Sequence, residues 1–441
     1  MDASMIGYLC IAIMLLMIAF RAPIALSMAV TGFVGFASMA VTGFVGFASI
    51  VAFQPAVAIL DSAPFDALSN YSFSPIPMFI LMGVFASKAR MSQELFNGAK
   101  TLFGSWRGGM ALAAVTSCGI FSAISGSSLA TAASMSRVAL PEMKRNGYSV
   151  SLATGTLAAG GTLGIMIPPS IALLLYALIT EQSVGDMFIA GVIPGLLGLA
   201  LYCLAVAVTV WIFPNLATPG EKTTVMQKLI GLKGLLPFTA IFAFIIAGIY
   251  AGFFTPTEAA AIGAALTLVI ALIRGMTWAM FLEAVNETLS ISAMIFFMII
   301  GAEIFGFFLS VSRISYSLVD YVQSLNLSPY MVLFAVLMLF ILLGCVMDSI
   351  AMLLLTVPVV FPLIQAAGFD PIWFGIVAVI TVEVGLITPP VGMNVFVIKS
   401  LDKDLNITDI FKGVIPFVLS DVVRLGLLIV FPSLALALLS H

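Results

Sequence analysis

Long runs of apolar residues separated by short polar stretches occupy most of this sequence. About 18 or more consecutive apolar residues are enough for a helix to cross the hydrocarbon core of a bilayer. The apolar runs indicate ten full spans, at Met5–Phe20, Ile24–Ile59, Pro75–Ser87, Ser149–Leu178, Met187–Phe213, Leu235–Phe253, Thr257–Ile273, Thr288–Leu309, Pro371–Ile398 and Gly413–Leu439. The pattern therefore predicts an all-α integral membrane protein with about ten to twelve transmembrane helices.

Two further apolar stretches, Gly108–Leu140 and Pro329–Ile364, are each interrupted near the middle by small or polar residues. The interruptions are Ser125–Ser128 in the first stretch and Gly344–Ser349 in the second. A polar break at membrane depth is tolerated only where protein buries it or where it lines a cavity. We therefore expect both stretches to form re-entrant helical hairpins.

The positions of Lys and Arg predict how the hairpins are oriented, because these residues concentrate in cytoplasmic loops. Basic residues flank the first hairpin on both sides, at Lys88, Arg90, Lys100, Arg107, Lys144 and Arg145. Residues 314–398 contain neither Lys nor Arg, which places the second hairpin on the outer side. The predicted loop with Asp61 and Asp66 also lacks basic residues and is expected there. The two hairpins should enter the membrane from opposite faces.

An internal repeat relates the two halves of the chain. Matching residues recur without a gap 221 positions apart (362 − 141 = 221; 390 − 169 = 221): Pro141, Gly147, Tyr148, Gly164, Pro168 and Pro169 correspond to Pro362, Gly368, Phe369, Gly385, Pro389 and Pro390. At this offset Ser127 in the first interruption corresponds to Asp348 in the second. Five predicted spans separate the hairpins, and an odd number inverts the second copy, so we predict an inverted-topology repeat with halves 1–220 and 221–441.

A shorter repetition occurs near the start of the chain, where residues 28–38 are followed by an identical copy at 39–49. We interpret it as a recent tandem duplication or an artefact of the sequence. Eleven residues add about 16 Å of helix, so the second span is expected to protrude.

Composition supports a lipid environment and weakens enzymatic alternatives. Hydrophobic residues make up 62% of the 441 residues and charged residues 8%, with a mean hydropathy of +1.21. The single histidine, His441, and four separated cysteines give no pattern for metal or acid/base catalysis. The net charge of −3 gives no indication of nucleic-acid binding.

Two Gly-x-x-x-Pro-Pro segments, Gly164–Pro169 and Gly385–Pro390, lie inside predicted spans and should break the helices. Backbone carbonyls freed at membrane depth need a partner. Unwound carbonyls together with hydroxyls suit a sodium ion, and the residues of suitable type are Ser125, Ser127, Ser128, Asp348 and Thr388. The alternative is that the breaks are structural kinks and the serines allow close helix packing.

Asp348 points to a bound cation, because a carboxylate deep in an apolar run costs about 3 kcal/mol or more unless it is paired. No Lys or Arg occurs within 30 residues on either side of it. Glu383 and Glu303 also lie in apolar spans and either serve a function or extend toward the membrane surface.

The chain resembles the large membrane subunit of tripartite ATP-independent periplasmic (TRAP) transporters, which take up organic acids in bacteria. The resemblance spans essentially the whole chain and rests on Arg21-x-Pro23-Ile24 and on residues 77–83 (PMFILMG), 119–131 (GIFSAISGSSLAT), 161–170 (GTLGIMIPPS), 248–261 (GIYAGFFTPTEAAA) and 385–392 (GLITPPVG). The 11-residue duplication near the second span departs from the family pattern.

This resemblance implies an elevator-type, sodium-coupled carrier in the bacterial inner membrane. Scaffold helices would occupy about residues 1–87 and 235–309, the hairpins about 108–140 and 329–364, and the unwound spans about 149–178 and 371–398. It also implies two partners, a small four-helix membrane subunit and a periplasmic substrate-binding protein. No small-subunit sequence precedes Met1, so we expect a separate chain. Carried onto matching positions, the first sodium site would use Ser125, Ser127, Gly164, Ile167 and Pro169, and the second Asp348, Gly385, Thr388 and Pro390.

Three other readings stay open at this point. An unpartnered sodium/dicarboxylate symporter would share the inverted hairpins, and a membrane-embedded enzyme would need a convergent catalytic cluster that we do not find. A channel would need more polar lining. Sialic acid, C4-dicarboxylates and other organic acids all fit as substrate, since no basic residue stands out in the predicted site.

Overall fold

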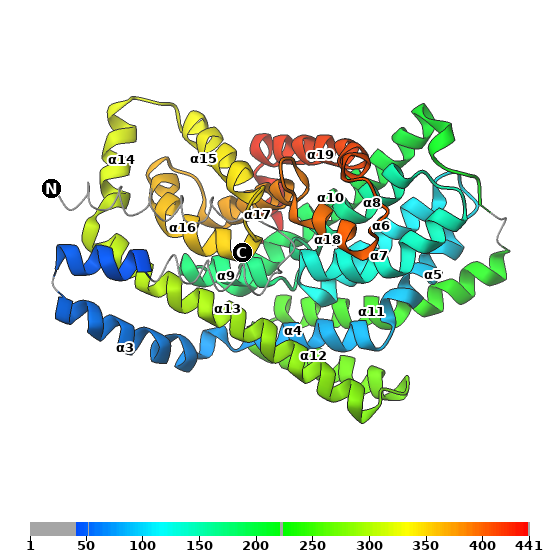
Figure 1. The fold of residues 1–441 in the computed structure, drawn as a ribbon, viewed down its shortest axis with the longest axis horizontal. Helices are drawn as coiled ribbons and strands as arrows, with labels where there is room; N and C mark the ends of the chain where they lie inside the picture. The colour runs from blue at the N-terminus through cyan, green and yellow to red at the C-terminus, as the bar shows by residue number, and fades with distance from the viewer. Residues whose placement is uncertain (1–40, 52, 221–223, 440–441) are drawn as a thin grey trace.

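The computed structural model describes residues 41–51, 53–220 and 224–439, and these residues are almost entirely helical (Figure 1). After a helix at Val41–Ile50, the first half contains α3 (Phe53–Ser69), α4 (Pro75–Lys88), α5 (Met91–Phe103), α6 (Gly109–Ser125), α7 (Ser128–Arg145), α8 (Val150–Thr162), α9 (Ile171–Ile179) and α10 (Val184–Ile212). The second half contains α11 (Val225–Tyr250), α12 (Pro256–Ile273), α13 (Trp278–Ser312), α14 (Ile314–Ser324), α15 (Pro329–Gly344), α16 (Ser349–Ala366), α17 (Pro371–Ile387), α18 (Met393–Leu401), α19 (Ile407–Val430) and α20 (Ser433–Leu436).

The helix boundaries repeat at the offset seen in the sequence. Helices α7 and α16 begin at residues 128 and 349 (349 − 128 = 221) and end at residues 145 and 366 (366 − 145 = 221). Helices α8 and α17 begin at residues 150 and 371, again 221 apart. The two halves thus place helix starts and helix breaks at equivalent positions.

Six described helices are long and apolar enough to cross a membrane: α10, residues Met226–Tyr250 of α11, α12, α13, α16 and α19. A seventh results if α3 and the segment Tyr71–Lys88, bent by 56°, form one span. This count covers the described residues and long unbroken helices, so it does not include the two predicted spans that are broken into α8 with α9 and α17 with α18. The predicted span Met5–Phe20 and the first part of Ile24–Ile59 lie outside the described residues.

The predicted second span does not continue as one long helix. The chain turns at Val51 and then enters α3, where Pro55 would clash with a helix continuing from Val51. Asp61 and Asp66 therefore lie on α3, not in a loop as the sequence suggested. The described part of the second 11-residue copy packs on α13 instead of protruding, since a Cβ at Gly43 would come within 2.8 Å of the Ile304 carbonyl oxygen.

The predicted span Pro75–Ser87 is also too short on its own. Helix α4 has 14 residues, about 21 Å of helix, whereas the hydrocarbon core is about 30 Å thick. Tyr71–Phe73 form a 3₁₀ turn ahead of it, and Pro75 and Pro77 lie in its first turn, where proline is tolerated. These signals end α3 and restart the chain as a separate helix.

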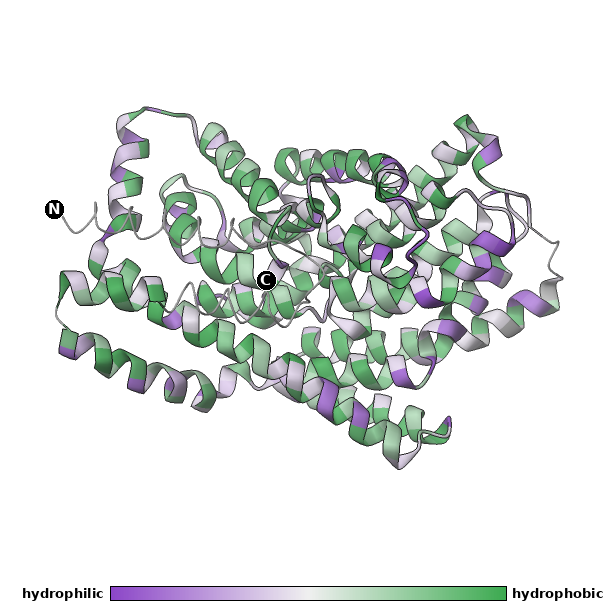
Figure 2. Ribbon diagram, viewed as in Figure 1, coloured by the Kyte–Doolittle hydropathy of each residue, from purple (hydrophilic) through white to green (hydrophobic). Residues whose placement is uncertain are grey.

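Two layers are visible in Figure 1, where α3, α4, α12 and α13 lie along the lower side and pack on one another. Above them, α6 to α9 and α15 to α19 surround the centre. There α8 and α17 are buried along nearly their whole lengths, as expected for helices that are apolar on all sides. Hydrophilic positions gather at the right-hand end of the same view, around α5 (Figure 2).

Candidate functional site

The first helix break brings the tip of the α6–α7 hairpin against the Gly-x-x-x-Pro-Pro segment. Helix α8 ends at Thr162 and α9 begins at Ile171, with a 3₁₀ turn at Leu163–Ile165 between them. A Cβ at Gly164 would lie 2.6 Å from the Ser127 carbonyl oxygen, so only glycine allows this approach. Gly126, with φ of +59°, lies against the Pro169 carbonyl. Ser127, Gly164 and Pro169 are thus close together.

Ser125 and Ile167 are the other two residues of the predicted first sodium site. The Ser125 hydroxyl is hydrogen-bonded to Thr131 Oγ1 at 2.6 Å and lies 3.4 Å from the Ser127 carbonyl oxygen. The Ile167 side chain packs on Gly195 of α10, so only its carbonyl oxygen could bind an ion. Thr131, which sequence reasoning did not select, adds a buried hydroxyl to this group.

The second break repeats this packing with different details. A Cβ at Gly385 would lie 2.7 Å from Gly344 Cα, so α17 presses against the end of α15. The amide of Gly392 donates to the Cys345 carbonyl at 3.2 Å, and the Cys345 thiol donates to the Pro389 carbonyl at 3.3 Å. Thr388 donates its hydroxyl hydrogen to the Val384 carbonyl at 2.6 Å, which leaves its oxygen lone pairs available.

Asp348 begins α16 at this break and accepts a hydrogen bond from the amide of Ile350 at 3.1 Å. Within residues 41–51, 53–220 and 224–439, it makes no ion pair with a basic side chain. Pro390 is exposed, whereas its counterpart Pro169 is buried. The second break is therefore the more open one.

A buried polar chain next to the first break was not foreseen. Ser128 donates to Glu383 Oε2 at 2.9 Å, and the Asn394 amide donates to Ser128 Oγ at 2.9 Å and to the Ala158 carbonyl at 3.1 Å. Glu383 is only 3% exposed, so it does not extend to the membrane surface. Glu303 on α13 is half-buried, and its Oε2 atom is buried without a hydrogen-bond partner among the described residues.

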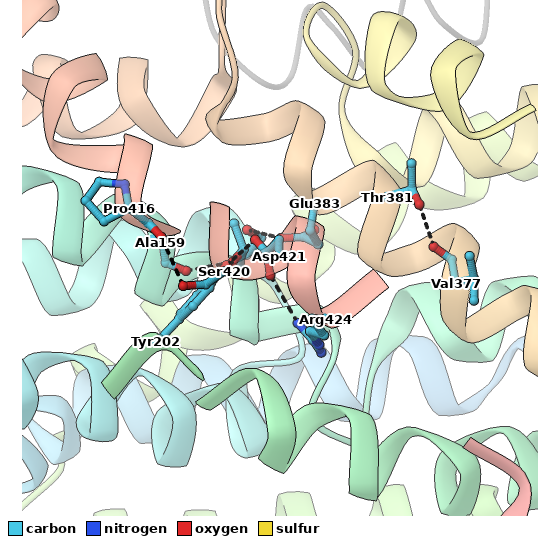
Figure 3. A network of polar contacts seen from close by, with 11 residues as sticks. Ala159, Tyr202, Val377, Thr381, Glu383, Pro416, Ser420, Asp421 and Arg424 are labelled. Carbon is cyan, nitrogen blue, oxygen red and sulfur yellow. Dashed lines mark hydrogen bonds and ion pairs between the residues drawn. The ribbon is translucent and has the colours of Figure 1, made fainter. Parts of the chain in front are cut away.

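A second buried cluster joins α8, α10 and α19 (Figure 3). The Tyr202 hydroxyl donates to Asp421 Oδ2 at 2.6 Å and lies 2.8 Å from Thr162 Oγ1, while Asp421 Oδ1 is 3.5 Å from Arg424 Nη1. The Arg424 guanidinium fits against α10 because residue 198 is glycine. Two charged residues three positions apart in an apolar run were a usable signal in the sequence.

Ion pairs tie the first hairpin to its surroundings at the polar end of the molecule. Lys100 pairs with Glu142 on α7 at 2.9 Å, and Lys144 at the end of α7 pairs with Asp402 in the α18–α19 loop. The hydrogen bond from the Lys144 ammonium holds the pKa of Asp402 below its usual range.

Residues 11–434 match the family described as "Tripartite ATP-independent periplasmic transporter, DctM component". The chain is 36% identical to the C4-dicarboxylate TRAP transporter large permease protein DctM of Pseudomonas aeruginosa, over 88% of this chain and 91% of that protein. It is 31% identical to the sialic acid TRAP transporter large permease protein SiaM of Vibrio cholerae, over 84% and 87% of the two chains.

Among solved structures, the Alcanivorax borkumensis YdaH transporter shares the fold with a TM-score of 0.63 and 14% identity, covering 92% of this chain and 99% of that one. The relatives are permeases, which agrees with a carrier and not an enzyme. The apolar helices and these relatives make it a multi-pass protein of the bacterial inner membrane. The chain belongs to the DctM family of TRAP transporters, whose members include the large permease subunits.

Proposed function

We propose that this chain carries a small organic acid into the cell together with sodium ions. The observation that supports this most strongly is the pair of helix breaks, each with its glycine pressed against the tip of a neighbouring hairpin. Ser125, Ser127 and the carbonyls of Gly164, Ile167 and Pro169 would hold one ion. Asp348, Thr388 and the carbonyls of Gly385 and Pro390 would hold the other, which would also offset the unpaired carboxylate.

The substrate is proposed to be a carboxylate, as in the relatives named for C4-dicarboxylates and sialic acid. It would be delivered by a periplasmic binding protein, and a small membrane subunit would complete the permease. An elevator movement fits the two layers: the hairpins, the broken helices and α19 would move as one body against α3, α4 and α11 to α13. The long α13 packs on α3, α4 and α16, so it would form part of the boundary between them.

Reconstitution in proteoliposomes tests this function. Substrate accumulation should require an inward sodium gradient and should stop when potassium or choline replaces sodium. Unchanged accumulation without sodium would overturn the proposal. Omitting the binding protein is the control for the remaining alternative: uptake that proceeds equally well without it would indicate an unpartnered symporter.

A further inference from the structure

A hydrogen bond joins the two halves of the chain at the first break. Glu383 lies on α17 in the second half, and its Oε2 atom accepts a hydrogen bond from Ser128 at 2.9 Å. Ser128 is the first residue of α7 and follows Ser127, whose carbonyl lies against Gly164. One buried carboxylate from the second half therefore holds the hairpin tip of the first half.

Asn394 on α18 fixes the direction of this contact. Its amide group donates to Ser128 Oγ at 2.9 Å and to the Ala158 carbonyl at 3.1 Å, so both of its hydrogens are used. Ser128 thus accepts from the Asn394 amide group, and its single hydrogen has two acceptors within reach, Glu383 Oε2 at 2.9 Å and Asn394 Oδ1 at 3.3 Å. The nearer acceptor, Glu383, is the one that Ser128 binds. The Glu383 carboxylate is the last acceptor in this series of hydrogen bonds. A hydrogen bond to an ionised acceptor is stronger than one to a neutral acceptor.

The charge of Glu383 lacks a direct partner. Its Oε1 atom is buried without a hydrogen bond in the described part of the protein. The charged groups that act on it electrostatically are Asp348, Asp421 and Arg424, and Arg424 is engaged with Asp421. A carboxylate in such surroundings stays ionised only if a cation lies nearby, and otherwise takes up a proton.

The repeat shows where that cation would be. The proposed second sodium site has a carboxylate at its own hairpin tip, Asp348, whereas the first site has the neutral Ser127 at the equivalent place. Glu383 in turn corresponds to the neutral Thr162 in the first half (383 − 162 = 221). Each of these two equivalent pairs therefore has one carboxylate, and both carboxylates lie in the second half. Asp348 lies at the tip of the second hairpin and Glu383 is hydrogen-bonded to Ser128 at the tip of the first, so one carboxylate accompanies each proposed ion.

We infer that Glu383 is a positioning residue for the first sodium site, supplying through the Ser127–Ser128 segment the negative charge that the neutral oxygens of that site lack. Glu383 also lies two residues before Gly385 of the second site, on the same rigid helix. It therefore links the two ions, and sodium binding is cooperative because of it. This inference rests on the proposed sodium coupling.

Glu383→Gln tests it, because glutamine keeps the shape and can accept from Ser128 but carries no charge. The half-saturating sodium concentration for uptake should rise roughly tenfold to fiftyfold, the effect of removing a unit charge several ångströms from a cation at an effective dielectric constant of about 20. The Hill coefficient for sodium should fall toward one. Thr381→Val is the matched control, since Thr381 is equally buried on α17 but donates only within that helix, to Val377 (Figure 3). It should leave both values unchanged.

Three measurements test whether Glu383 positions the first sodium site. A Glu383→Gln protein with a changed melting temperature but an unaltered sodium dependence would overturn the inference, because Glu383 would then be structural or already uncharged. Ser128→Ala removes the hydrogen bond to Glu383 but keeps the charge of Glu383. It should therefore weaken sodium binding less than Glu383→Gln does. Measuring the sodium dependence of wild-type uptake first separates sodium coupling from the role of Glu383. If wild-type uptake needs no sodium, the proposed function fails. If wild-type uptake needs sodium, the variants test only the role of Glu383.

Discussion

Gly164 is the position where a single methyl group should most directly disturb the first proposed ion site. In Gly164→Ala the new Cβ would lie 2.6 Å from the Ser127 carbonyl oxygen and 2.8 Å from its carbon. Ordinary contact begins at 3.4 Å, so the hairpin tip and the break must separate by about 0.8 Å (3.4 − 2.6 = 0.8). Both contacting groups are backbone, which cannot rotate away as a flexible side chain can.

The cost of such overpacking is typically about 1–3 kcal/mol, or roughly fivefold to more than a hundredfold in an equilibrium constant. Because the separation displaces a proposed ligand, we expect the half-saturating sodium concentration for uptake to rise by about that factor. Gly385→Ala, with its Cβ 2.7 Å from Gly344 Cα, should act similarly at the second break.

Sodium titration of substrate uptake in proteoliposomes measures this effect. Gly306→Ala is the matched control, because Gly306 lies within α13 and a Cβ there would have no heavy atom within 4 Å. Its helix should be slightly stabilised and its transport unchanged. A Gly164→Ala carrier with wild-type sodium dependence would refute the assignment of the ion to this contact.

Further predictions concern charge, topology and pH. Asp348→Asn should raise the half-saturating sodium concentration roughly tenfold to a hundredfold, from a loss of about 1–3 kcal/mol, whereas unaltered transport with a higher melting temperature would mean that its charge is only a structural cost. In a cysteine-free background, Arg107→Cys and Lys144→Cys should react with an impermeant maleimide from the cytoplasmic side and Asp370→Cys from the periplasmic side; labelling of Asp370→Cys only from the cytoplasm would rule out the inverted repeat. The lowered pKa of Asp402 means that its pairing with Lys144 stabilises the fold above the ordinary aspartate pKa of about 3.9 and that this stabilisation disappears as pH falls through the folded value. Melting temperatures of wild type and Asp402→Asn should therefore differ at neutral pH and converge in acid, and a constant difference would contradict the pairing.

Local signals predicted the helix breaks well. The two proline pairs keep α8 and α17 from continuing, and Ser127 and Asp348 begin the preceding helices α7 and α16 as N-caps. Hydropathy located the apolar runs, and the proline signals located the breaks that divide two of them into α8 with α9 and α17 with α18. Pro55 was the missed signal, and it explains why the predicted span Ile24–Ile59 does not continue as one helix into α3.

Contacts distant in sequence could not be predicted. Ser128 and Glu383 are 255 residues apart, and Asn394 is 266 residues from Ser128. From the sequence, Glu383 was a carboxylate in an apolar run that could equally extend to the membrane surface. Only the packing of α17 between the two halves shows that its side chain is buried. Arg424 was overlooked because its span was read as uniformly apolar, although it carries a charge pair with Asp421.

The most direct test of the account is to count the sodium ions that enter with each substrate molecule. Proteoliposomes holding the permease with its partners would be given labelled sodium and labelled substrate, and both fluxes would be measured together. If each of the two ion sites contributes one ion, sodium should enter only together with substrate, and about two sodium ions should enter with each substrate molecule. Substrate entry without accompanying sodium would contradict the central claim.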